Sequence, residues 1–184
     1  MNSREAVCAT LKALAEARVS HMLTGGLAVN LYTLPRFTKD ADIVIQMESA
    51  AFDEFVRRLP AEIHLDPQIT LETITGSRRH ILTLKGSEFR IELFLLGDDP
   101  HHRERFSRRR QRRLPDLGIE TWVAAPEDMI VQKLRWNREQ DRMDAKNIIG
   151  VQGNDLDWPY IERWCDAHGT RARLEEIRAS IPPI

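Results

Sequence analysis

Residues 23–45 are LTGGLAVNLYTLPRFTKDADIVI, and this stretch decides how the N-terminal half of the chain is organised. An apolar run ends at the glycine pair Gly25-Gly26, a short helical pattern follows, and a second apolar run begins at Asp40 and Asp42. Because side chains alternate between the two faces of a strand, Asp40 and Asp42 would point the same way where this second run forms a strand. Two such carboxylates repel each other unless a cation lies between them.

The glycine pair and the two aspartates together predict a metal-dependent nucleotide site. A hard divalent cation such as Mg²⁺ (or Mn²⁺) takes carboxylate oxygens as ligands and keeps positions for phosphate oxygens. Glycines at the start of a helix allow the backbone to approach those phosphates closely. Two plainer interpretations stay open: solvated carboxylates at the start of a strand, and a turn that only needs a positive φ.

Glu92 is the candidate for a third carboxylate, which a two-metal site would take from a neighbouring strand. It alternates with apolar residues in the predicted strand 89–96, where a carboxylate is unusual without a partner. It would complete the metal site and accept the proton of an attacking hydroxyl. The alternative is an ion pair on the strand face, with Arg90 or another basic residue.

The first block resembles the nucleotidyltransferase superfamily, whose polymerase-beta-like fold carries a Gly-Gly or Gly-Ser turn followed by Asp-x-Asp on the next strand. The longer pattern over residues 25–42, which includes Arg36-x-Thr38, is most similar to the AbiEii-type branch. That branch includes toxins of toxin–antitoxin systems. The superfamily usually has aspartate where this chain has Glu92, and often serine where it has Gly26, so phosphate contact would rest on backbone N–H groups.

A second block, over residues 126–144, resembles the Pro-Glu-Asp, Lys-Leu and Arg-Asp-x-x-Asp pattern of the same branch. The resemblance implies that Lys133 and Asp141 border the nucleotide pocket, together with Gly25, Gly26, Arg36 and Thr38. Structural alternatives remain for two of these positions. Arg36 either contacts the triphosphate or pairs with an aspartate, and Lys133 with Asp141 and Asp144 would also suit a salt-bridge set between helices.

An arginine run, Arg103–Arg113, holds seven arginines in eleven residues and follows the Glu92 strand. Such a run is usually a solvated face. The absence of lysine favours bidentate contact with phosphate, as on tRNA or another RNA, while docking to an acidic protein such as an antitoxin is the alternative. His101 and His102, just before the run, are expected to be exposed loop residues.

Composition limits the remaining choices. The chain has 184 residues, 42% of them hydrophobic, which is enough for one substantial core. A net charge of -1 gives no global attraction to nucleic acid or to an anionic membrane. No long apolar run or signal core appears, so a cytoplasmic location without a membrane is expected. Cys8 and Cys165 fit no metal spacing and are expected to be buried reduced thiols.

The hydrophobic pattern predicts an α/β (α+β) fold, with a mixed sheet flanked by helices and a helical C-terminal part. Residues 1–125 form the predicted nucleotidyltransferase-like sheet domain, and residues 126–184 a helical extension packed on it. Strands are expected at 19–23, 41–47, 69–74, 80–84, 89–96 and 119–123. Helices are expected at 3–18, 27–34, 50–59, 126–138, 141–150, 157–167 and 170–180.

The sequence therefore favours a magnesium-dependent nucleotidyltransferase that moves NMP from an NTP to an acceptor. Asp40, Asp42 and Glu92 would hold the metal. The principal alternative is a binding or regulatory protein on the same fold that has lost catalysis, which the glutamate at position 92 and the missing serine favour. A scaffold protein whose Asp-x-Asp is coincidental is a third possibility.

Overall fold

A computed structural model describes residues 1–115 and 117–182 of the chain. Residue 116 of the predicted sheet domain and residues 183–184 of the predicted extension lie outside the described residues. The strands are β1 (Ser20–Thr24), β2 (Asp40–Gln46), β3 (Ile63–Leu65), β4 (Thr70–Leu71), β5 (Arg78–Leu84), β6 (Arg90–Leu95), β7 (Arg110–Leu114) and β8 (Ile119–Val123). The helices are α1 (Ser3–Glu16), α2 (Gly25–Val29), α3 (Ser49–Arg58), α4 (Pro100–Ser107), α5 (Pro126–Trp136), α6 (Glu139–Gln152), α7 (Trp158–Ala167) and α8 (Arg171–Ala179).

All eight strands belong to one mixed sheet, in the order β3-β5-β6-β2-β1-β8-β7, with β4 paired to β5. The β2–β6 and β1–β8 pairs are parallel, and the other pairs are antiparallel. Strand β2 lies in the middle and is buried along Ala41–Ile45, which explains its continuous apolar run. The carboxylate-bearing start of β2 is therefore held between two neighbouring strands.

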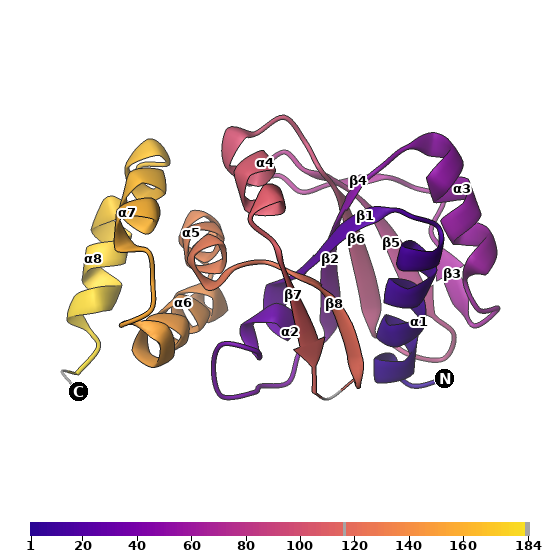
Figure 1. The fold of residues 1–184 in the computed structure, drawn as a ribbon, viewed down its shortest axis with the longest axis horizontal. Helices are drawn as coiled ribbons and strands as arrows, with labels where there is room; N and C mark the ends of the chain where they lie inside the picture. Colours follow the sequence, from indigo (N-terminus) through magenta and orange to yellow (C-terminus); the bar gives the residue numbers. More distant parts are fainter. Residues whose placement is uncertain (116, 183–184) are drawn as a thin grey trace.

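Helices surround the sheet unevenly (Figure 1). Helices α1 and α3 contact each other beside the sheet, and α1 begins with a capping box in which Asn2 and Glu5 satisfy each other's backbone N–H groups. Helices α5 and α6 stand at the other side, with α7 and α8 outermost. Helix α5 begins with Pro126, whose fixed φ suits a first helical turn, and ends where Asn137 adopts a left-handed conformation at φ 54°.

The predicted fold class is confirmed, with several local corrections. Strand β3, helix α4 and strand β7 were not expected, and the expected helix 27–34 ends at Val29. The sequence between Val29 and Asp40 forms turns instead, in which Thr33 Oγ1 donates to the Val29 carbonyl at 3.1 Å. Hydroxyls that bond to a nearby carbonyl in this way compete with helix continuation. No described helix has the length and apolar character needed to cross a bilayer.

Candidate functional site

Strand pairing brings the three predicted carboxylates together on one face of the sheet. Asp40 and Asp42 lie two residues apart on β2, and the parallel register pairs Asp42 with Glu92 on β6. On the other side, the antiparallel register pairs Asp42 with Thr24, the last residue of β1. Paired residues on neighbouring strands lie about 5 Å apart, with side chains on the same face. The carboxylates thus form a compact acidic cluster next to the Gly25-Gly26 turn.

The Gly25-Gly26 turn is pressed against these residues. Gly25 has φ +64°, and a Cβ at this position would lie 1.7 Å from Asp42 Oδ2. A Cβ on Gly26 would lie 2.8 Å from Thr38 Oγ1. The positive φ alone would favour glycine at position 25, but the close approach to Asp42 makes any larger residue impossible without movement. The glycine pair therefore shapes the acidic cluster as well as the turn.

Burial and mutual repulsion raise the pKa of Asp42 to about 7. Desolvation is the largest cause, the charges of Asp40 and Glu92 add to it, and Lys133 and Arg138 oppose it. Asp42 is 8% exposed, and within the described residues its carboxyl group accepts no hydrogen bond. This carboxylate is therefore unusually poorly compensated by the protein itself.

Glu92 has a partner, unlike Asp42. Arg79 on β5 donates from Nη1 to Glu92 Oε2, so the ion pair considered from the sequence exists, with Arg79 in place of Arg90. Burial still raises the pKa of Glu92, with Asp40 adding and Arg79 opposing. One carboxylate oxygen is held by the guanidinium, while no hydrogen bond within the described part of the chain reaches the other.

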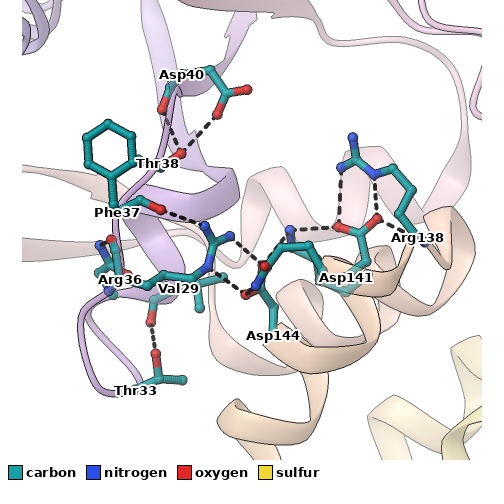
Figure 2. Close-up of polar contacts among 12 residues, drawn as sticks. Val29, Thr33, Arg36, Phe37, Thr38, Asp40, Arg138, Asp141 and Asp144 are labelled. Atoms are coloured by element: carbon teal, nitrogen blue, oxygen red, sulfur yellow. Dashed lines mark hydrogen bonds and ion pairs between the residues drawn. The ribbon is translucent and has the colours of Figure 1, made fainter. Parts of the chain in front are cut away.

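Thr38 contacts Asp40. Its Oγ1 lies 3.0 Å from Asp40 Oδ1 and 3.1 Å from the Asp40 carbonyl oxygen, as Figure 2 shows. The hydroxyl therefore orients the first carboxylate of the Asp-x-Asp pair. This position next to Gly26 and Asp40 explains why a small polar residue suits the site.

Arg36, Lys133 and Asp141, which the resemblance places at the nucleotide, join a second charged group beside the cluster (Figure 2). Lys133 Nζ lies 2.8 Å from Asp141 and 2.9 Å from Asp144, and Arg36 donates two hydrogen bonds of 2.8 Å to Asp144. Arg138 donates to Asp141 at 2.6 Å. These contacts join α5, α6 and the segment after α2. We call the five residues the helix ion-pair network.

The arginine run does not form one surface. Helix α4 contains Arg103 and buried Arg105, while β7 carries three exposed arginines, Arg110, Arg112 and Arg113. Arg108, just after α4, pairs with Asp128 at 3.2 Å and stacks over Tyr160. The expectation that His101 and His102 are exposed loop residues is wrong. Both are buried in α4, because Pro100 starts a helix that turns them inward.

Asp99, His101 and His168 bring possible metal-ligand atoms within 4.8 Å of one another, away from the acidic cluster. Arg135, however, donates to Asp99 Oδ2 at 3.0 Å. Burial lowers the pKa of His101 and His168, and the charge of Arg135 lowers both further. A guanidinium group thus already compensates this carboxylate. Asp99 is therefore a less suitable metal ligand than Asp42.

A small cleft, with a volume of about 20 Å³, lies between the Gly25 turn and α5. Phe94, two residues after Glu92, forms part of the cleft, and Lys133, Gln132 and Trp136 line it from α5. Arg105 reaches the same cleft from α4. From the sequence, Gln132 and Trp136 were not predicted as site residues, and Arg105 was predicted only as one of the seven arginines of the run. The sequence offered one signal for Gln132, which is its position beside Lys133. It offered none for Arg105, because α4 carries no clear periodic pattern that would show which residues face inward.

Comparisons with known proteins place the fold. Neither a protein-family model nor a curated protein sequence matches this chain. The solution structure of the antibiotic-resistance factor ANT(2'')-Ia matches with a TM-score of 0.59 at 13% identity, covering 97% of this chain and 98% of that chain. A crystal structure of ANT(2'')-Ia in complex with adenylyl-2''-tobramycin matches with a TM-score of 0.59 at 11% identity, covering 94% and 99%.

The chain has a nucleotidyltransferase fold. At these identities the likeness shows the fold alone, and it extends over nearly the full length of both chains. The AbiEii-type branch stays a prediction.

The acidic cluster has the donor chemistry that Mg²⁺ requires. All three side chains offer hard carboxylate oxygens, and Asp42 is buried beside two like charges, with no cation of the described residues in contact with it. Glu92 fits through one oxygen, since Arg79 holds the other. Asp40, Asp42 and Glu92 are therefore the residues that would hold a divalent ion.

Proposed function

We propose that this protein is a metal-dependent nucleotidyltransferase, which moves NMP from an NTP to a hydroxyl group of an acceptor and releases pyrophosphate. One observation carries the proposal: Asp40, Asp42 and Glu92 share a sheet face beside a glycine turn, and no cation in the part of the chain that the structure describes contacts Asp42. The nucleotidyltransferase fold supports it, as does the adenylyl-tobramycin bound to ANT(2'')-Ia.

Each residue has a role that follows from its place. Asp40 and Asp42 would hold the metal, and Thr38 keeps Asp40 oriented. Bound Mg²⁺ would supply charge neutralisation at the transferring phosphoryl group. The Gly25-Gly26 turn at the start of α2 would offer backbone N–H groups to the polyphosphate. Lys133 and Arg36 would add positive potential from the helix ion-pair network without leaving their carboxylate partners.

Glu92 is the candidate base. The acceptor hydroxyl oxygen attacks the α-phosphorus, the bond from that phosphorus to the pyrophosphate oxygen breaks, and the hydroxyl proton passes to Glu92. The raised pKa of Glu92 makes it a better proton acceptor than an ordinary carboxylate. Arg79 orients the Glu92 carboxylate through its hydrogen bond, which would help catalysis. Its positive charge also opposes the rise in the pKa of Glu92, which would weaken Glu92 as a base.

For the acceptor we propose a phosphate-bearing molecule such as tRNA or another RNA, with a protein hydroxyl as the alternative. The exposed arginines of β7 support an RNA, because guanidinium groups bind phosphate bidentately. The resemblance to the AbiEii-type branch supports a toxin of a toxin–antitoxin system, which an antitoxin would neutralise.

A catalytically inactive nucleotide-binding protein is the second candidate. The Arg79–Glu92 ion pair favours it, since a guanidinium occupies an oxygen that the reaction would use. Binding without transfer is the property that separates this candidate from the first.

The test is transfer of label from each α-labelled NTP to RNA or protein, with pyrophosphate release measured in parallel. We expect magnesium-dependent transfer that Asp42→Asn abolishes. Asp53→Asn, the same chemical change at an exposed position of α3, should leave transfer intact. Transfer that survives in Asp42→Asn would refute the mechanism. Magnesium-dependent NTP binding without transfer or pyrophosphate release would establish the second candidate.

A further inference from the structure

Arg105 differs from the other arginines of the run because it is buried and faces the cleft. It lies on α4, is 6% exposed, and lines the cleft together with Gly25 and Lys133 (α4 and α5 in Figure 1). Arg103, two residues earlier, is exposed and pairs with Asp98. The same helix thus directs one arginine to solvent and one to the candidate site.

Arg105 has no partner in the described part of the chain. Among the described residues, no carboxylate lies within 4.0 Å of its guanidinium nitrogens, and its buried Nε atom has no hydrogen-bond acceptor. The two neighbouring acids are engaged elsewhere: Arg135 binds Asp99, and Arg108 and Tyr160 bind Asp128. Burial lowers the pKa of Arg105 to about 10, so the group still carries its charge at neutral pH.

Two more buried polar atoms of the same cleft lack partners. They are Nε1 of Trp136, a donor, and the side-chain oxygen of Gln132, whose amide also offers N–H donors. Buried polar groups are normally hydrogen-bonded, and an unpaired buried charge is costly. Two of these side chains, Arg105 and Trp136, have an unpaired donor, and their grouping with Lys133 in one cleft is what a site for an absent anion would leave behind.

We propose that Arg105 is an anion-binding residue of this cleft and takes a phosphate group, with Trp136 and Gln132 completing its contacts. The planar guanidinium offers five donors in a fork that fits phosphate oxygens. The proposal rests on the proposed function for the identity of the ligand. The phosphate comes either from the polyphosphate end of the NTP or from the acceptor.

The test compares Arg105→Met with Arg103→Met, the same change on the solvent side of α4. Calorimetric titration would use inorganic pyrophosphate, Mg²⁺ with NTP, and pyrophosphate added to protein saturated with a non-hydrolysable NTP. We expect Arg105→Met to weaken pyrophosphate binding about tenfold or more, as for loss of a charge-assisted contact, while Arg103→Met binds as wild type. Arg105→Lys should recover part of the affinity, since it restores charge but not the fork.

The source of the phosphate follows from the other two titrations. If Arg105→Met weakens the binding of NTP as much as that of pyrophosphate, Arg105 binds the polyphosphate end of the NTP. Unchanged NTP affinity with lost pyrophosphate binding to the saturated protein assigns the acceptor.

Thermal stability separates a binding role from a structural one. Removing an unpaired buried cation should leave the melting temperature of the ligand-free protein unchanged or raise it. A lowered melting temperature with unchanged anion binding would overturn the proposal, as would a wild type that binds none of the probes. NTP binding that is equal in wild type and Arg105→Met, with pyrophosphate also unaffected, would overturn the role of Arg105 and leave the proposed function standing.

Discussion

Two groups of carboxylates lie side by side in this protein, and neighbouring cations neutralise one group but not the other. In the helix ion-pair network, Asp141 and Asp144 are contacted by Lys133, Arg36 and Arg138, and the pKa of each aspartate is lowered. In the acidic cluster, Asp42 contacts no cation among the described residues, and burial beside Asp40 and Glu92 raises its pKa to about 7.

The difference separates a structural group from a functional one. Buried charges that the protein neutralises internally hold α5 and α6 against the loop that carries Arg36. Buried charges that it leaves uncompensated cost stability unless a ligand neutralises them. Both groups carry Asp residues two or three apart, so the spacing does not distinguish them. The two groups differ in whether Lys or Arg side chains on neighbouring elements contact the carboxylates.

The largest expected effect is on the helix ion-pair network. Lys133→Met removes the cation shared by Asp141 and Asp144 and should lower the free energy of unfolding by about 3 kcal/mol or more, measured by urea denaturation. The matched control Lys12→Met breaks only an exposed pair with Glu16 and should cost less than about 0.5 kcal/mol. Equal, small losses of unfolding free energy in both variants would mean that Lys133 does not stabilise the fold. The helix ion-pair network would then not differ from the acidic cluster as a structural group.

Gly25→Ala should be the next largest. The new Cβ would meet Asp42 Oδ2 at 1.7 Å in a backbone with φ +64°, so we expect a loss of about 2–3 kcal/mol together with weakened binding of Mg²⁺ and NTP. Gly86→Ala isolates the backbone effect, because Gly86 has φ +76° with open space around it, and should cost about 1 kcal/mol. If the two variants behave alike, the close approach to Asp42 does not constrain the cluster.

The acidic cluster could be predicted because local rules determine it. Asp40 and Asp42 are spaced i, i+2 within β2, and Glu92 alternates with apolar residues within β6. Each pattern lies inside one strand, and the apolar residues of that strand predict it. The pairing of Asp42 with Glu92 is a matter of register between β2 and β6, which single-strand patterns do not contain. The contact of Arg79 with Glu92 depends on a second register, the antiparallel pairing of β5 with β6.

The arginine run marks the part that could not be predicted. Helix α4 and strand β7 have little hydrophobic periodicity, and β7 is fixed by its antiparallel pairing with β8 at the edge of the sheet. Which arginine turns inward depends on how α4 packs near α5. The burial of His101, His102 and Arg105 therefore follows from tertiary contacts, against the usual preference of charged residues for the surface.

The most direct test of the uncompensated charge at Asp42 is the free energy of unfolding at pH 5 and pH 8, with and without millimolar Mg²⁺. Burial raises the pKa of the Asp42 carboxyl from its ordinary 3.8 to about 7 in the folded state. Between pH 5 and pH 8, the folded state therefore binds more protons than the unfolded state. Stability should therefore fall as pH rises through that window, by about 1.4 kcal/mol per unit of pKa difference at most.

We predict that wild type loses roughly 2 kcal/mol more than Asp42→Asn between pH 5 and pH 8, and that Mg²⁺ restores it at pH 8. Asp53→Asn should follow wild type. Identical pH dependence in wild type and Asp42→Asn, with no effect of Mg²⁺ at pH 8, would contradict the claim that this cluster is built for a divalent cation.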